Sequence, residues 1–197
     1  MKKEELKDNK LKPIWFFKEG GALGEFEAPY AQFTSKLYFP LMNEKGLKTY
    51  VKPELKGDIC TDYHHYLTVP NVTEDLHRQA PGRNFWIHLK GKDPWSVSGQ
   101  SVFQKNNLWR DPEKSKVTGK PGVFELQRIH PDGLEVTTTL FVSITENVEI
   151  MLVKVHNKSD ETIRFKAYNA TPIYGRSADH VRDHRQVTTM FQETAVD

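Results

Sequence analysis

Residues 174–188, YGRSADHVRDHRQVT, concentrate side chains that bind charged or hydroxylated ligands. Arginine presents a planar fork of N–H donors that suits carboxylates and phosphates and can also donate to sugar hydroxyls. Aspartate can neutralise these arginines or accept hydrogen bonds from the same hydroxyls. The stretch therefore indicates either a sugar or phosphate site or an ion-pair network that braces a loop. Its charged residues are Arg176, Asp179, His180, Arg182, Asp183, His184 and Arg185.

Two histidine pairs raise the question of a metal. His180 and His184 lie four residues apart, a spacing that grips zinc on a helix, but arginines flank the intervening aspartate and no third ligand is evident. In YHHY (residues 63–66), adjacent residues of a strand would point to opposite faces, so we interpret these histidines as ordinary surface and core residues. We expect no metal site.

The remaining candidates for chemistry are weak. No nucleophile-elbow pattern is present, and we expect Cys60 to be a buried structural thiol. GGALGEF (residues 20–26) lacks the P-loop lysine and the Rossmann spacing. Trp86, Trp95 and Trp109 can supply flat apolar faces to a sugar site, although core packing is the ordinary role of any one tryptophan. We therefore assign no catalytic residue.

Composition restricts the class of protein. The 197 residues suit one domain, and 37% hydrophobic with 27% charged residues excludes a disordered chain. No apolar run approaches the roughly 20 residues that span a bilayer. The lysine-rich start has no apolar segment after it, and the chain has one cysteine, so we expect a cytoplasmic protein. The net charge of +2 is spread along the chain without a basic stripe, which argues against nucleic-acid binding.

Alternating apolar residues from residue 84 onward predict successive strands. In NFWIHL, Phe85, Ile87 and Leu89 share one side. VFELQRIH runs into the turn signal PDG and returns as LEVTTTLFV, residues 134–142. We expect VEIMLVKVH and TIRFKAYNA to pair with each other across the turn at residues 157–160. No long segment has a 3.6-residue period.

These hairpins predict an all-β fold, an antiparallel β-sandwich. We expect residues 1–36 to be an N-terminal lead-in and residues 37–197 to form the sandwich domain. The last segment, VTTMFQETAVD, resembles a strand without a closing element, and stable proteins cover such an edge. We therefore expect the sandwich to be incomplete at its C-terminal end and to be completed by further sequence or another subunit.

Several segments resemble the N-terminal region of inverting glycoside phosphorylases, glycoside hydrolase family 94, which includes cellobiose, chitobiose, laminaribiose and 1,2-β-oligoglucan phosphorylases. These segments are LYFPLMNEKG, EDLH, RNFW, WSVSG and above all YGRSADHVRDHRQVT, so they extend from about residue 37 to residue 188. The last is the most distinctive, and the 1,2-β-oligoglucan and laminaribiose branch is the most similar.

The resemblance implies a galactose-mutarotase-like supersandwich followed by a helical (α/α)₆ barrel, which lies outside these residues. That barrel would carry the general acid and most of the site for inorganic phosphate, the co-substrate, so we expect this chain alone to be inactive. No cofactor is implied. The expected partners are a β-linked gluco-oligosaccharide, the barrel domain and a second subunit in a homodimer.

The resemblance also assigns binding residues. It places Arg185 near the acceptor sugar, with His184 and Gln186 as neighbours, and it includes Arg176, Asp179 and Arg182 in the motif without a defined contact. Two alternatives remain open at this point. One is a stand-alone carbohydrate-binding sandwich without catalysis, and the other is a structural interaction domain whose arginines form ion pairs.

Overall fold

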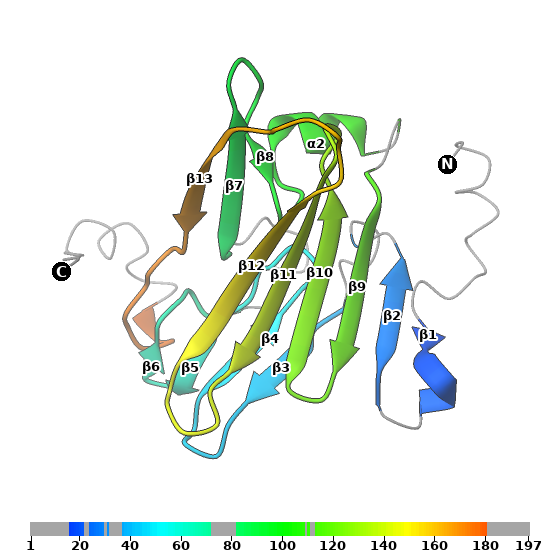
Figure 1. Ribbon diagram of the computed structural model, residues 1–197. Coiled ribbons are helices and arrows are strands. Elements are labelled where there is room, and N and C mark those ends of the chain that lie inside the picture. Colours follow the sequence, from blue (N-terminus) through cyan, green and yellow to red (C-terminus); the bar gives the residue numbers. More distant parts are fainter. Residues whose placement is uncertain are drawn as a thin grey trace.

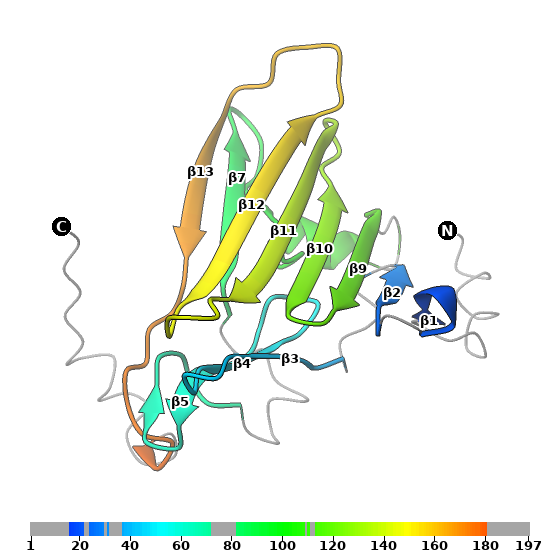
Figure 2. The same cartoon turned by 60° about the horizontal axis from the view of Figure 1, so that its bottom comes forward.

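The computed structural model describes residues 16–21, 24–29, 31, 37–71, 82–108, 110 and 113–180. Among these residues the fold consists of antiparallel strands in three sheets, together with two short helical segments (Figures 1 and 2). The helical segments are η2 (Lys18–Gly21) and α2 (Val102–Asn107). The prediction of an all-β fold is confirmed.

The largest sheet has six strands, and the other two have three and four. In order across the first sheet they are β1 (Phe16–Phe17), β2 (Phe26–Pro29), β9 (Ser115–Lys120), β10 (Val123–Ile129), β11 (Leu134–Val142) and β12 (Glu149–Asn157). The three-stranded sheet contains β13 (Phe165–Ala170), β7 (Asn84–Leu89) and β8 (Trp95–Ser96). The four-stranded sheet contains β3 (Phe39–Met42), β4 (Lys48–Val51), β5 (Ile59–Asp62) and β6 (His65–Tyr66).

One face of the six-stranded sheet forms the core. Along β11, every second side chain from Leu134 to Leu140 is buried, and the residues between them are not, because successive side chains of a strand point to opposite faces. Residues of both smaller sheets, such as Leu41 of β3 and Ile87 of β7, belong to the same buried cluster. The two smaller sheets therefore cover one face of the large sheet, as in a sandwich.

The predicted faces of two strand segments are confirmed. In β7, Ile87 and Leu89 are buried and Phe85 packs against the core. In β11, Val142 also packs against the core at the end of the buried row. Both strands carry four or more alternating positions, so the core face follows directly from the sequence.

The expected pairing of residues 148–156 with residues 162–170 is wrong. Over its whole length β12 pairs with β11, and β13 pairs with β7 in the three-stranded sheet. The chain thus leaves one sheet and joins another after the turn at residues 157–160. Burial alternates along β12, whereas all residues of β13 are exposed. Alternation in a sequence defines the face of a strand and does not identify its partner.

The N-terminal part contributes to the large sheet. β1 and β2 continue it beyond β9, and Phe26, Ala28 and Ala31 are buried in the core. The expected strand VTTMFQETAVD lies outside the described residues. Within those residues, no helix is long and apolar enough to cross a membrane.

A buried polar network joins the three sheets around Arg83. The Arg83 side chain is 2% exposed and donates through Nε and Nη2 to the carboxylate of Glu149, the first residue of β12. It also donates to Thr49 Oγ1 of β4, and Thr49 in turn donates to Glu149 at 2.6 Å. Because Arg83 directly precedes β7, the ion pair links two of the sheets, and the hydrogen bonds of Thr49 add the third.

A second buried network surrounds the short helix α2. The Ser101 hydroxyl accepts from the Gln104 backbone N–H, and the Gln104 side chain accepts from the Ser101 backbone N–H. These two hydrogen bonds form a capping box at the start of the helix. Gln104 also donates to Glu113 at 2.8 Å, and the Trp95 indole N–H donates to the other oxygen of the same carboxylate at 2.7 Å. The guanidinium of Arg128, which is 3% exposed, lies 3.5 Å from Glu113 and donates to the Ser98 carbonyl.

Candidate functional site

Arg176 and Asp179, two of the residues assigned from the sequence, lie on a segment that follows β13 and contacts the hairpin of β5 and β6. Tyr66 and Arg176 exchange both backbone hydrogen bonds, at 3.0 and 3.1 Å, as neighbours in an antiparallel pair do. The Ala178 N–H donates to the Tyr63 carbonyl at 3.1 Å. The segment therefore joins the edge of the hairpin through an isolated β-bridge.

Hydroxyl groups from two segments hold the Asp179 carboxylate. The Tyr63 hydroxyl donates to Oδ1 at 2.8 Å, and the Ser177 hydroxyl donates to Oδ2 at 3.1 Å. These bonds, with that of Tyr63 as the larger cause, lower the pKa of Asp179 below its ordinary value. The exposed carboxylate is thus ionised at neutral pH, and its oxygens retain lone pairs for further donors.

The turn between β5 and β6 presents two aromatic rings beside this carboxylate. The rings of Tyr63 and His64 meet edge to face, 5.3 Å between centroids, and His64 Nδ1 lies 3.3 Å from the Ser177 hydroxyl. Asp62 fixes the turn, because it accepts from the His64 N–H at 2.8 Å and contacts the His65 ring at 2.8 Å. Tyr63 is 56% exposed.

The interpretation of YHHY as alternating strand residues is therefore wrong for Tyr63 and His64. They form a turn, and a turn directs neighbouring side chains to the same side. Both side chains meet the segment that contains Ser177 and Asp179. We call the exposed Tyr63, His64 and Asp179, together with the half-buried Arg176 and Ser177, the Tyr63–Asp179 surface.

Arg176 and Asp179 do not form an ion pair. Within the described part of the chain, the Asp179 carboxylate contacts Tyr63, Ser177 and His64, and the Arg176 guanidinium has no hydrogen-bonding or charged partner. The expectation of an ion-pair network that braces the loop therefore fails for this pair. The guanidinium retains its donors for a ligand.

The other assigned residues cannot be placed on this surface. Arg182, His184, Arg185 and Gln186 lie outside the described residues, as does Asp183. Their assignment remains a prediction that the structure does not test.

Trp95 does not supply the expected flat face, because it is 3% exposed and its indole N–H is bound to Glu113. Trp86 is half-buried in β7, and Trp109 lies outside the described residues. The exposed ring beside the assigned residues belongs to Tyr63. No motif identified it, since its proximity to Asp179 depends on a contact between residues 116 positions apart.

The described residues offer binding groups without an evident nucleophile. Cys60 is buried, and burial raises the pKa of its thiol, as expected for a structural cysteine. In these residues no three histidine, cysteine, aspartate or glutamate side chains gather as they would around a metal. The Tyr63–Asp179 surface combines an anion, a guanidinium, hydroxyls and an aromatic ring, a set that suits sugar hydroxyls and an apolar sugar face.

The family of the chain follows from a match over most of its length. The sequence model described as "Glycosyl hydrolase 94, supersandwich domain" matches residues 59–197. The chain belongs to glycosyl hydrolase family 94. The match includes both the β5–β6 hairpin and the segment of Asp179, and it agrees with the observed sandwich. A comparison with the curated proteins finds no match.

Membership of family 94 makes this a domain of a carbohydrate-active protein of the glycoside phosphorylase family. The structure separates the family-like motifs into two kinds. RNFW and WSVSG contribute Arg83, Asn84, Trp95, Ser96 and Ser98 to the buried polar interior. YGRSAD places the half-buried Arg176 and the exposed Asp179 at the surface. The first two motifs thus belong to the buried scaffold, whereas the third lies at the surface.

Proposed function

We propose that this chain is the N-terminal β-sandwich domain of an inverting β-glucan or disaccharide phosphorylase. In this proposal the Tyr63–Asp179 surface, together with Arg182, His184, Arg185 and Gln186, contributes to the subsite for the acceptor sugar. The observation that carries it is the hydrogen-bonded contact between the β5–β6 hairpin and the family-like motif, in which Asp179 is ionised and the Arg176 guanidinium has no partner among the described residues.

The proposed reaction requires groups from elsewhere in the protein. Phosphate would attack the anomeric carbon, and a general acid on a helical barrel would protonate the departing oxygen, so that glucose 1-phosphate forms with inversion. The domain would hold the sugar that departs: Asp179 accepts from its hydroxyls and Arg176 donates to them. We expect no phosphorolysis from this chain alone. We also propose that the protein is a cytoplasmic homodimer in which the Tyr63–Asp179 surface forms one wall of the partner subunit's active site.

Calorimetric titration of the chain with sophorose, laminaribiose, cellobiose and glucose 1-phosphate tests the binding part of the proposal. Asp179→Asn, Tyr63→Phe and Arg185→Ala should each weaken binding of the preferred disaccharide, by about tenfold for a lost charge-assisted hydrogen bond. Asp160→Asn is the matched control, because Asp160 is an exposed aspartate in a turn on another part of the surface.

The outcomes separate the proposal from its alternatives. Disaccharide binding by the chain alone, lost in these variants, identifies an autonomous sugar-binding surface. If the chain alone binds no disaccharide, the same variants are made in a protein that includes the barrel domain. A raised KM for the acceptor sugar in those variants would show that this domain supplies only part of the binding site. Unchanged acceptor kinetics in Arg185→Ala and Asp179→Asn would remove the site assignment. Release of glucose 1-phosphate by the chain alone would show that no barrel is required.

A further inference from the structure

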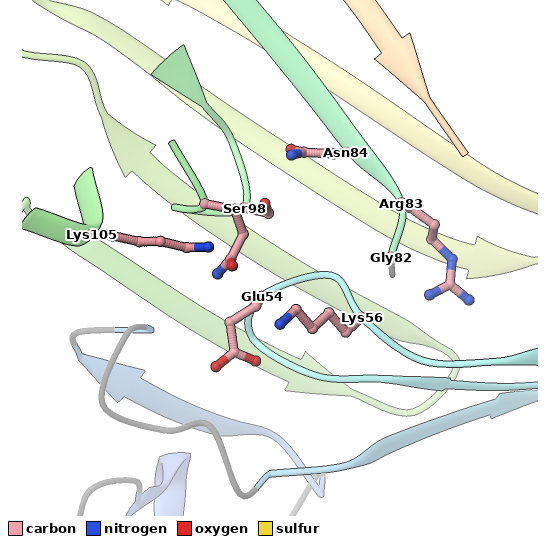
Figure 3. Close-up of a pocket in the computed structure, with 8 residues that line it drawn as sticks. Glu54, Lys56, Gly82, Arg83, Asn84, Ser98 and Lys105 are labelled. Carbon is pink, nitrogen blue, oxygen red and sulfur yellow. The ribbon is translucent and has the colours of Figure 1, made fainter. Parts of the chain in front are cut away.

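A polar pocket lies where the loop after β4 meets the start of β7 and helix α2. Figure 3 shows Lys56 and Lys105 directed toward its space, whereas Arg83 turns its guanidinium away. Both lysines already interact with other groups of the protein, and the buried Oε2 atom of Glu54 is shielded from solvent. The charged groups of this pocket therefore indicate no ligand.

The outer face of the four-stranded sheet is a more open surface, on the side away from the core. Figure 2 shows β3, β4 and β5 beneath the six-stranded sheet. The residues of these strands that face the core are buried, namely Leu41, Thr49, Val51 and Ile59. Their neighbours in sequence point to the outer face. There Met42 is 59% and Tyr50 is 40% exposed, and Lys48 is exposed as well.

Directly opposite residues form a row across this outer face. Met42 of β3 lies opposite Lys48 of β4, which in turn lies opposite Cys60 of β5. Tyr66 of β6 lies opposite both Cys60 and Arg176. Residues directly opposite each other in antiparallel strands have their side chains on the same face. The row therefore ends at Arg176, a member of the Tyr63–Asp179 surface, after four strand spacings of about 4.8 Å each.

Two tyrosine rings belong to this face. The Tyr66 hydroxyl is hydrogen-bonded to the short Cys60 side chain, so the ring leans across β5 and does not stand upright on the sheet. Burial is the main cause that raises the pKa of Tyr66 to about 12, and the smaller contributions include one from Tyr50. The two phenols thus lie on neighbouring parts of the face. They offer apolar ring surfaces beside polar groups, as sugar binding requires.

Two cations donate from different positions along the row. Lys48 and Arg176 lie three strand spacings apart, about 14 Å, which suits successive units of a chain better than one small anion. Their N–H groups can donate to hydroxyls. Lysine is depleted in the centres of protein interfaces, so the position of Lys48 within the row argues against a protein partner.

An extended sugar chain matches these features, because each of its units has an apolar ring face and hydroxyls that accept hydrogen bonds. We infer that the outer face of the four-stranded sheet binds a linear β-glucan chain, which continues from the Tyr63–Asp179 surface along the row from Arg176 to Lys48. The inference rests on the proposed function for the first sugar. It adds a second surface and a preference for oligosaccharides over disaccharides.

Titration calorimetry on the full chain tests this inference with the disaccharide and the tetrasaccharide of β-1,2-, β-1,3- and β-1,4-glucan as probes. At least one tetrasaccharide should bind tenfold or more tightly than its disaccharide. Tyr50→Ala and Lys48→Met should each weaken tetrasaccharide binding about tenfold and leave disaccharide binding unchanged. Tyr168→Ala and Lys154→Met are the matched controls, because both residues are exposed on other sheets, and they should change neither affinity.

The outcomes separate this inference from the proposed function. Disaccharide binding that falls in Asp179→Asn but does not increase with chain length overturns the inference and leaves the proposed function standing. A gain with chain length that is lost in Tyr50→Ala supports the inference even if Asp179→Asn and Arg185→Ala leave acceptor kinetics unchanged. A gain that persists in both Tyr50→Ala and Lys48→Met overturns it, as does the absence of tetrasaccharide binding.

Two further measurements complete the test. Sedimentation shows whether the face packs on a protein, because self-association that Tyr50→Ala abolishes, without tetrasaccharide binding, would overturn the inference in favour of a contact between chains. Thermal melting of each variant confirms that it is folded.

Discussion

Gly99 occupies a position where both its backbone and its surroundings exclude a side chain. Its φ angle is +76°, and a Cβ added there would lie 2.5 Å from Nη2 of Arg128. The guanidinium cannot withdraw easily, because it is 3% exposed and is held by Glu113 and the Ser98 carbonyl. The glycine that ends WSVSG therefore makes room for a buried cation.

Gly99→Ala should lower the free energy of unfolding by about 2–4 kcal/mol, the sum of left-handed backbone strain and overpacking. Gly122→Ala is the control, since Gly122 has the same φ of +76° with nothing within 4 Å of the added Cβ. That variant should lose only about 1 kcal/mol. Urea unfolding measures both, and equal losses would show that the Arg128 contact contributes nothing.

Residue types predicted part of the candidate surface. The arginine and aspartate content of residues 174–188 singled out Arg176 and Asp179, because guanidinium and carboxylate groups suit hydroxylated or charged ligands. Tyr63 and His64 were interpreted as ordinary residues. Their role depends on hydrogen bonds to Ser177 and Asp179, and such long-range contacts leave no local pattern in a single sequence.

At the scale of elements, one ion pair ties the start of β12 to the residue before β7. Glu149→Leu leaves the buried Arg83 charge without a partner, and Arg83→Met does the same to Glu149, so each variant should cost about 3–5 kcal/mol of stability. The double variant Arg83→Met/Glu149→Leu should cost much less than the sum, since neither charge remains. Chemical unfolding of all four proteins completes the cycle. Additive losses would contradict coupling across the sheets.

The elements themselves were predictable where alternation is long. β7, β10 and β11 follow from their apolar periodicity, because one face of each is buried. The partners of β12 and β13 were not predictable in this way. The sequence allows β12 to pair with either β11 or β13, its two neighbours in sequence. The pairing of β13 with β7 depends on the tertiary arrangement of the sheets.

At the scale of the whole molecule, one histidine makes stability depend on pH. His130 is 5% exposed, meets Trp95 edge to face at 5.2 Å, and accepts from the Asp132 N–H through Nδ1. Burial lowers its pKa below the ordinary value of 6.5. Below pH 6.5, His130 is protonated in the unfolded chain but remains neutral in the folded chain. The free energy of unfolding therefore decreases as the pH falls toward the pKa of His130 in the folded state.

His130→Phe should remove this component of the pH dependence. The difference in unfolding free energy between wild type and variant should be constant above about pH 7.5 and should shift against the wild type as the pH falls below about 6.5. Urea unfolding at a series of pH values from 5 to 8 measures it. A difference that does not vary with pH would show that His130 titrates alike in both states.

The paired backbone bonds between Tyr66 and Arg176 have a consequence for protein engineering. The two segments that make the exposed surface are encoded some 110 positions apart, yet they meet in a fixed register. A chimera with a crossover between them would join a hairpin from one parent to a motif from the other, with Tyr63 and Asp179 mismatched. Transferring this surface to a relative should therefore require that both segments be exchanged together.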